Sequence, residues 1–388
     1  MRKLSKPISF LFLLLAGSAC TETLFTKIGD QVASPTAVAV DPAGLRAYLV
    51  NSNQRLKYLD TTVMVLNITN PQSPTLIKTA AIPNFSGQAS LDLAQKRLYV
   101  PNRLSEDNLD PDDRLLQINL DEGSPDFLSV TELASGDSPF GIACCDTGGR
   151  FYVATNGGAL LRYDPAGNLA TFTSLQFSVD LSSGETVEGK GASEVALIGD
   201  QAFVTTRGGE IFVVNLAELG GTTQSLDYVI TSETEDFRGI ATNGKLLYVA
   251  DGNFDNPSLL VIDPSDLKPS DSVATTEVAL STVVKQTMPL GQSTDEVLSN
   301  PNEVVYFDAR KEVYVSDLGK NNIVVVNVLT GEIAATLNLN SNGFVSDQPF
   351  GLAPFSLGGT DYLYVTNLAS DNLLVVDLAT RTVVGKYP

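Results

Sequence analysis

The chain has 388 residues, with 45 Asp and Glu against 25 Lys and Arg, a formal charge of −20, three Cys, and no His or Trp. The absence of His excludes Ser-His-Asp and Cys-His catalysis, and it also excludes histidine-ligated zinc or haem. The acidic balance disfavours binding to nucleic acid, and 43% hydrophobic with 18% charged residues is typical of a globular protein.

The first 19 residues have the order of a secretory signal peptide: three basic residues, an apolar run over 8–16, and small residues before Cys20. The apolar run is too short to cross a membrane, which takes roughly 20 residues. The ending Gly17-Ser18-Ala19-Cys20 resembles a bacterial lipoprotein signal. The resemblance implies that Cys20 becomes the first residue of the mature chain and carries acyl chains, which anchor it in the outer membrane or at the cell surface. The alternative is cleavage after Ala19, which leaves Cys20 as a free thiol on a soluble periplasmic or secreted protein.

A repeat runs through the remainder of the chain. Each copy has a β-rich run opened by an aromatic residue, a polar turn, and a second apolar run closed by Asn or Asp. The opening residues are Tyr48, Tyr99, Tyr152, Phe203, Tyr248, Tyr314 and Tyr364, and the closing residues are Asn67, Asn119, Asp164, Asn215, Asp263, Asn327 and Asp377. Both markers therefore count seven copies.

Each copy also has a short apolar run before the aromatic residue and another after the closing residue, which predicts four short strands per copy. Four antiparallel strands in a repeat of about 50 residues are typical of a propeller blade. We therefore predict an all-β fold, a single seven-bladed β-propeller over 34–388. The approximate blades are 34–83, 84–136, 137–189, 190–235, 236–299, 300–345 and 346–388. We expect the last blade to close the ring by packing on the first, and residues 20–33 to be a tether with partial strand pairing.

The last copy contains Tyr364-Val365-Thr366-Asn367, and related tetrapeptides occur at 48–51, 99–102 and 314–317. These segments resemble the repeats of the YVTN β-propeller family, which is similar in architecture to lactonase and gluconolactonase propellers. The resemblance implies a propeller fold and a secreted or surface location, and it indicates little about activity.

Three copies contain longer segments: the turns 51–62 and 103–114, the second of which is acidic, and an insertion over 264–299. Insertions in repeat proteins map to loops, and loops on one rim often form a binding surface. The alternative is that these loops are solvated segments without a role.

Polar residues recur three positions after each opening aromatic residue: Asn51, Asn102, Thr155, Thr206, Asp251, Asp317 and Asn367. In a propeller these equivalent positions form a ring at one end of the channel, where Asn51, Asn102 and Asn367 are candidate ligand-binding residues. The interpretation we favour for the ring is that short Asx and Thr side chains fix the following turns.

Carboxylates stand at the start of the innermost strand in two copies only, as Glu194 and Glu303. With Asp251 and Asp317 they would place four acidic groups in one sector of the channel, and two Arg residues, Arg207 and Arg238, are close in the repeat. We favour a hydrated channel in which the Glu residues pair with these Arg residues. The alternative is a Ca²⁺ site made by the four carboxylates, because Ca²⁺ prefers six to eight oxygen ligands.

Cys144 and Cys145 are adjacent on a predicted inner strand. Neighbouring strand residues point to opposite faces, so we expect two buried free thiols, with a disulfide between them as the alternative.

These observations favour a non-enzymatic, lipid-anchored binding or scaffold propeller of the bacterial cell envelope. It would be a monomer without a cofactor, attached to the membrane through its lipid only, and it would bind a protein, a glycan or a small ligand through its longer loops. The alternative is a carboxylate- and Ca²⁺-dependent, lactonase-like hydrolase with its site at the channel mouth.

Overall fold

A computed structural model describes residues 26–55, 57–83, 85–103, 113–180, 185–188, 191–219, 226–232, 235–268, 275–292, 294–341 and 343–388. The signal peptide, Cys20 and most of the acidic turn at 103–114 lie outside these residues. No helix in the described part of the chain is long and apolar enough to cross a membrane.

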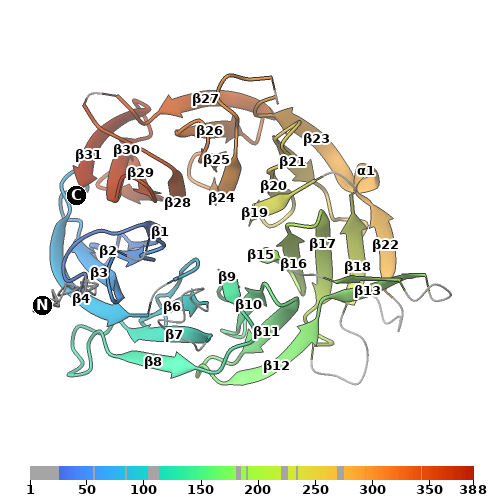
Figure 1. Ribbon diagram of the computed structural model, residues 1–388, viewed down its shortest axis with the longest axis horizontal. Coiled ribbons are helices and arrows are strands. Elements are labelled where there is room, and N and C mark those ends of the chain that lie inside the picture. Colours follow the sequence, from blue (N-terminus) through green and yellow to red (C-terminus); the bar gives the residue numbers. More distant parts are fainter. Residues whose placement is uncertain are drawn as a thin grey trace, which may run out of the picture.

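Seven sheets, numbered here as blades 1 to 7 and each built on four antiparallel strands, stand in a ring with their first strands facing the centre (Figure 1). Blades 1 to 3 are β1 (Pro35–Asp41), β2 (Arg46–Asn51), β3 (Thr61–Asn67) and β4 (Thr75–Ile82); β5 (Ser90–Asp92), β6 (Arg97–Asn102), β7 (Arg114–Asn119) and β8 (Val130–Leu133); and β9 (Pro139–Ala143), β10 (Phe151–Thr155), β11 (Ala159–Tyr163) and β12 (Leu169–Ser174). Blades 4 and 5 are β15 (Ala192–Ile198), β16 (Gln201–Thr206), β17 (Glu210–Asn215), β18 (Leu226–Thr231) and β22 (Thr276–Ala279); and β19 (Phe237–Thr242), β20 (Leu247–Asp251), β21 (Ser258–Ile262) and β23 (Val284–Pro289). Blades 6 and 7 are β24 (Pro301–Phe307), β25 (Glu312–Asp317), β26 (Asn322–Asn327) and β27 (Glu332–Asn338); and β28 (Pro349–Leu357), β29 (Thr360–Asn367), β30 (Asn372–Asp377) and β31 (Thr382–Tyr387).

The predicted seven-bladed fold is confirmed, and its core lies between neighbouring blades. The opening aromatic residue of each repeat lies on the second strand and is buried. Tyr99 of blade 2, for example, stacks on Phe151 of blade 3 with ring centroids 4.1 Å apart. Because the middle strands are apolar on both faces, each blade buries its flanks only when the next blade is in place.

An irregularity recurs at the start of the innermost strands. The pairing between the first and second strands skips residues after Pro35, Ala192, Phe237, Pro301 and Pro349. Such a bulge leaves residues outside the regular ladder and redirects their side chains. The residues skipped in blades 4 and 6 include Glu194 and Glu303, so the bulge is what turns these carboxylates toward the channel.

The ring closes by packing of blade 7 on blade 1, because all four strands of blade 7 come from the C-terminal end of the chain. The Asp371 carboxylate accepts the Ser34 N–H at 2.7 Å and pairs with Lys57 Nζ at 2.7 Å. The Tyr364 hydroxyl donates to the Pro71 carbonyl at 2.8 Å. Residues 26–33 lie against blade 1 without forming a strand.

The insertion of the fifth repeat leaves its own blade, which the sequence did not predict. Its strand β22 pairs in parallel with β18 and adds a fifth strand to the outside of blade 4. One helical turn, α1 (Leu280–Val283), then leads back to β23 of blade 5. Leu280 and Val283 are buried in the core shared by blades 4 and 5, which gives the excursion an apolar contact. A hairpin of β13 (Gln176–Asp180) and β14 (Glu185–Glu188) also extends between blades 3 and 4 (Figure 1).

Candidate functional site

The seven recurring polar residues at the ends of the second strands are at most 3% exposed. Asn51 illustrates their contacts: its Oδ1 accepts the Ala33 N–H at 3.1 Å and its Nδ2 donates to Thr62 Oγ1 at 2.8 Å. The side chain therefore ties the loop before the inner strand to the strand that follows it. This geometry agrees with the turn-fixing interpretation.

Asn102 and Asn367 make similar contacts. Asn102 Nδ2 donates to the Pro83 carbonyl at 3.1 Å, and Asn367 Nδ2 donates to Asn372 Oδ1 at 2.8 Å. Asn102 thus binds the segment that joins blades 1 and 2, Asn367 binds the next strand of its own blade, and neither residue lines the channel cavity.

The two aspartates of this set are bound by backbone amides. Asp317 Oδ1 accepts the N–H groups of Asn300, Gly319 and Lys320 at 2.8 to 3.0 Å. Asp251 Oδ1 accepts the Asp236 N–H, which precedes β19, and the Asn253 N–H, which follows β20, each at 3.0 Å. Burial nonetheless raises the pKa of Asp251 to about 6, and the two backbone hydrogen bonds act in the opposite direction.

Glu194 and Glu303 do meet in the channel. Their side chains are hydrogen-bonded to each other, Gln88 Nε2 donates to Glu303 Oε2 at 3.0 Å, and the Ile240 N–H donates to Glu194 Oε2 at 2.9 Å. The three side chains line a cavity of about 220 Å³, whose other walls come from the innermost segments of all seven blades.

The two carboxyl groups are electrostatically coupled. Burial, together with the charge of the neighbouring Glu303, raises the pKa of Glu194 well above its usual value. Burial also raises the pKa of Glu303, to about 7, although hydrogen bonds from Glu194 and Gln88 act to lower it. Two carboxyl groups in contact cannot both ionise readily, so one of them keeps its proton near neutrality.

The expected pairing of these Glu residues with Arg207 and Arg238 is wrong. Both guanidinium groups instead bind Asp236, which Arg238 contacts at 2.7 Å. Burial alone would raise the pKa of Asp236, but its hydrogen bonds to Arg238 and Arg207 hold the pKa below its usual value. The position of Asp236 just before the inner strand of blade 5 places it closer to both Arg residues than the glutamates are.

The four carboxylates proposed as Ca²⁺ ligands do not come together. Glu194 and Glu303 line the channel cavity, while Asp251 and Asp317 bind loop amides and lie outside its lining. Among the described residues, the group that brings three candidate metal-ligating atoms within 4.8 Å of one another is a different one, Asp92 with Cys144 and Cys145.

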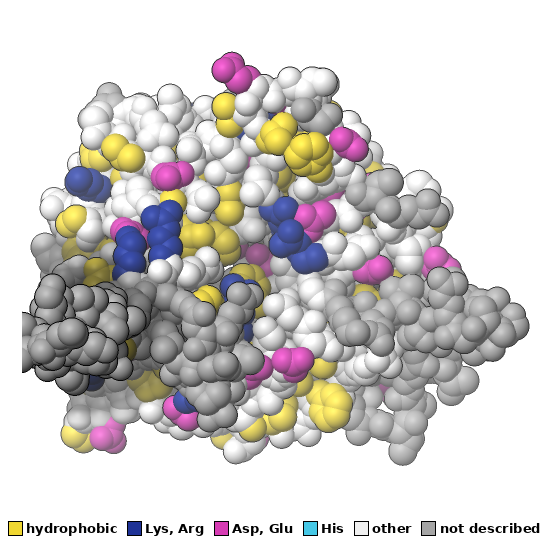
Figure 2. All heavy atoms as spheres, viewed as in Figure 1, with side chains coloured by type: hydrophobic (Ala, Val, Ile, Leu, Met, Phe, Trp, Pro, Cys, Tyr) yellow, Lys and Arg dark blue, Asp and Glu magenta, His cyan; other side chains and the backbone are white. Residues whose placement is uncertain are grey.

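A larger cleft lies between blades 5 and 6. Its volume is about 830 Å³. Its walls come from the start of β19 and the residue before it, and from the loops after β20, β23 and β25: Asp236, Arg238, Gly252, Asn253, Phe254, Asp255, Asn256, Leu298, Ser299, Asn300 and Gly319. The Phe254 ring is 66% exposed, and Leu298 gives a second apolar contact surface. On the face shown in Figure 2, Lys and Arg side chains around the centre of the ring lie beside acidic and hydrophobic ones.

Hydrogen bonds hold the floor of this cleft in place. The Arg238 guanidinium packs against Gly252 so closely that a Cβ atom added to Gly252 would lie 2.4 Å from Arg238 Nε. The same guanidinium donates a hydrogen bond to Asn300 Oδ1. Asn253 Oδ1 accepts the Asp255 N–H at 2.9 Å and fixes the turn that presents Phe254. The sequence identified the long insertion, and Asp251 at the start of this loop, but it did not identify Phe254, Leu298 or Asn300 as candidate binding residues. An exposed aromatic residue in a turn of Asn and Asp was the available signal.

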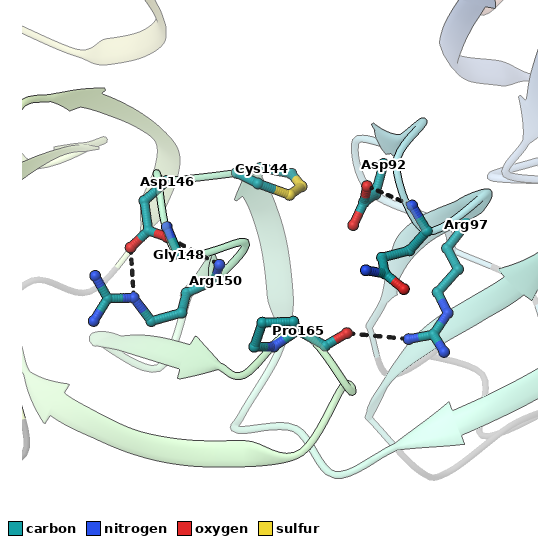
Figure 3. The surroundings of a disulfide bond; sticks show 9 residues. Asp92, Arg97, Cys144, Asp146, Gly148, Arg150 and Pro165 are labelled. Carbon is teal, nitrogen blue, oxygen red and sulfur yellow. Dashed lines mark hydrogen bonds and ion pairs between the residues drawn. A yellow bond between two sulfur atoms is a disulfide. The ribbon is translucent and has the colours of Figure 1, made fainter.

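The cysteines also differ from the expectation of two buried free thiols. Cys144 and Cys145 form a disulfide immediately after β9, where the regular strand has ended, and Cys145 is exposed. Figure 3 shows this disulfide facing Asp92, which ends the inner strand of blade 2.

Comparison with known proteins supports the fold. Hydrazine synthase from Kuenenia stuttgartiensis matches with a TM-score of 0.66 and 14% identity, over 92% of this chain and 99% of that chain. The computationally designed protein Ika8 matches with a TM-score of 0.54 and 13% identity, over 93% of this chain and 89% of that one. At such identities the likeness defines the class of protein, a seven-bladed β-propeller. No family model and no curated protein matches the chain, so its relation to YVTN repeats stays a prediction.

Proposed function

We propose that this protein is a non-enzymatic binding propeller of the bacterial cell envelope, anchored by lipid at Cys20, and that its cleft between blades 5 and 6 binds a neutral glycan. The observation that carries the proposal is this cleft, in which an exposed Phe254 ring lies among amide, guanidinium and carboxylate groups.

The size of the cleft favours a small ligand over a protein. Small-molecule sites typically measure about 300 to 1,000 Å³, and the cleft of about 830 Å³ falls in that range. A stable protein interface buries about 800 Å² on each partner and is centred on several large anchors. Within the described cleft lining, Phe254 is the one aromatic residue.

The chemistry of the cleft favours a neutral saccharide. Sugar rings offer apolar C–H faces that pack on an aromatic ring, and their hydroxyl groups exchange hydrogen bonds with Asn, Asp and Arg side chains. Asp236 and Asp255 lie in the cleft with Arg238, and the whole chain carries a formal charge of −20. An anionic ligand would therefore be repelled, whereas a neutral one would not.

A lactonase-like hydrolase is the second candidate, and the buried, coupled carboxyl groups of Glu194 and Glu303 favour it. Two carboxyl groups of which one is protonated and one ionised can act as general acid and general base. The pair, however, lies in a cavity of about 220 Å³, smaller than typical small-molecule sites, and its second pair of proposed Ca²⁺ ligands lies elsewhere.

The binding proposal is tested by screening the mature chain against an array of neutral and acidic glycans and titrating the strongest hit by calorimetry. We expect a neutral oligosaccharide to bind and Phe254→Ala to weaken binding at least about tenfold, since an aromatic anchor contributes more than about 1.4 kcal/mol. Phe172→Ala is the matched control, because Phe172 is 63% exposed on the outer strand of blade 3, away from the cleft. Equal loss in both variants, or binding of acidic glycans only, would contradict the proposal.

The anchor is tested separately by detergent-phase partitioning of the protein expressed with its signal peptide. We expect the wild type to enter the detergent phase and Cys20→Ser to stay in the aqueous phase. Equal partitioning of the two proteins would rule out lipid attachment at Cys20 and would leave the glycan proposal untouched.

A further inference from the structure

A second cluster of reactive side chains lies away from the cleft, where the inner strands of blades 2 and 3 end. The disulfide of Cys144 and Cys145 follows β9, and Asp92 is the last residue of β5. One carboxylate oxygen and both sulfur atoms lie within 4.8 Å of one another. Figure 3 shows the sulfur pair and the carboxylate facing each other from adjacent loops.

The disulfide contributes little to stability. A disulfide stabilises a protein mainly by restricting the unfolded chain, and the effect grows with the number of residues in the closed loop. Cys144 and Cys145 are adjacent, so their bond closes the shortest loop that a chain allows. Cys145 is also exposed, so a reductant can reach its sulfur. A chemical role therefore explains this bond better than a structural one.

Asp92 is placed as a ligand rather than as a surface charge. It is only 7% exposed, and in the described part of the chain its carboxylate receives one hydrogen bond, from the Gln95 N–H to Oδ1 at 3.0 Å. The nearby Asp146 carboxylate, by contrast, is occupied: it accepts from Arg150 Nε at 2.6 Å, from the Tyr152 hydroxyl at 2.8 Å, and from two backbone N–H groups. Asp92 thus remains available to the sulfur atoms.

We propose that Cys144, Cys145 and Asp92 form a redox-gated site for a thiophilic metal ion, for which Zn²⁺ is the expected ligand. Thiolate and carboxylate are both common Zn²⁺ ligands, and three protein ligands leave a fourth position for water. Zn–S bonds of about 2.3 Å and Zn–O bonds of about 2.0 to 2.2 Å place tetrahedral ligand atoms roughly 3.5 to 3.8 Å apart. The carboxylate oxygen already lies within 4.8 Å of both sulfur atoms, and breaking the S–S bond lets the two sulfur atoms move apart to this spacing.

The gate is a two-electron reduction. One thiolate of a dithiol reductant attacks the exposed Cys145 sulfur, breaks the S–S bond and forms a mixed disulfide with Cys145. The second thiolate of the reductant then attacks its own sulfur in this mixed disulfide and releases Cys145. The protein gains two electrons and two protons as two Cys thiols, and the reductant leaves as its own disulfide. Zn²⁺ binding then releases the two thiol protons and leaves two thiolates and the Asp92 carboxylate on the metal.

The test uses the mature chain with Cys20→Ser, so that only this pair of thiols titrates. After reduction with a dithiol and its removal under anaerobic conditions, we expect two titratable thiols and one Zn²⁺ bound per chain, measured by calorimetry. The oxidised protein should bind none at this site. Co²⁺ should give thiolate-to-metal charge-transfer absorption in the reduced protein only.

Two variants make the test specific. Asp92→Asn should leave two titratable thiols but weaken Zn²⁺ binding at least about tenfold, whereas Asp126→Asn, an exposed aspartate of the same blade, should leave the affinity unchanged. Cys144→Ser with Cys145→Ser should abolish binding, with an unchanged circular dichroism spectrum as the check on folding. The proposal is overturned if the bond resists the dithiol, if reduced and oxidised proteins bind Zn²⁺ alike, or if Asp92→Asn binds as tightly as the wild type.

Discussion

Replacing one member of the buried carboxyl pair by its amide should stabilise the protein at neutral and alkaline pH. Glu303→Gln keeps the shape of the side chain, keeps an oxygen for the Gln88 amide, and supplies an N–H donor for Glu194. It removes the charge that the fold has to bury when both glutamates ionise.

The magnitude follows from the pKa of Glu303, which is raised from 4.5 to about 7. A raised carboxyl pKa means that the folded protein holds the proton more tightly than the unfolded chain does. The resulting stabilisation is complete below about pH 4.5 and is lost as the pH rises through about 7. A shift of about 2.5 units in pKa corresponds to at most about 3 to 4 kcal/mol, since each unit is worth about 1.4 kcal/mol.

The assay is urea unfolding of the wild type and Glu303→Gln at several pH values between 5 and 8. The difference in unfolding free energy between the two proteins should grow in favour of the variant as the pH rises. Other titrating groups, such as Asp251, are present in both proteins, so their contributions cancel in this difference. Glu332→Gln, an exposed glutamate of the same blade, is the control and should follow the wild type. Curves of equal pH dependence for the wild type and Glu303→Gln, or a less stable variant at pH 8, would refute the argument.

Two further predictions concern the ring and its turns. Gly351→Ala should lower the unfolding free energy by about 1 to 3 kcal/mol, because the added Cβ atom would lie 2.5 Å from the Thr36 carbonyl oxygen where blade 7 meets blade 1. Gly123→Ala should be nearly neutral, because its Cβ atom would meet nothing nearer than 3.5 Å, and thermal melts of both variants would check the difference. Asp317→Ala should cost more than about 2 kcal/mol in chemical unfolding, because it leaves three backbone N–H groups without their carboxylate acceptor. A loss within 0.5 kcal/mol, the range typical of a surface change, would contradict that role.

The number and order of blades followed from the sequence because they rest on a local signal repeated seven times. Tyr48 and Tyr364 occupy equivalent buried positions at opposite ends of the chain, and the same residue type predicts the same packing in each blade. The excursion of β22 to blade 4 could not be predicted in this way, since its parallel pairing with β18 is non-local and depends on apolar contacts such as Leu280.

The candidate site was predictable only in part for a related reason. Glu194 and Glu303 stand at equivalent positions of blades 4 and 6, so the repeat geometry placed both in the channel. The partners of the two glutamates depend on distances that the repeat does not specify. Arg207 and Arg238, which we expected beside the glutamates, form ion pairs with Asp236 instead. Phe254 lines a cleft only because its loop lies near two distant segments, the end of the insertion of its own repeat at Leu298 and the loop after β25 of blade 6 at Gly319. The sequence does not encode this proximity locally.

The most direct test of the proposed binding role is a crystal structure of the mature chain with the glycan identified by the array. Our account predicts a sugar ring packed on Phe254, with its hydroxyl groups bonded to the side chains of Asn300 and its neighbours in the cleft. A sugar in the channel beside Glu194 and Glu303, with the cleft between blades 5 and 6 empty, would contradict it and would favour the hydrolase.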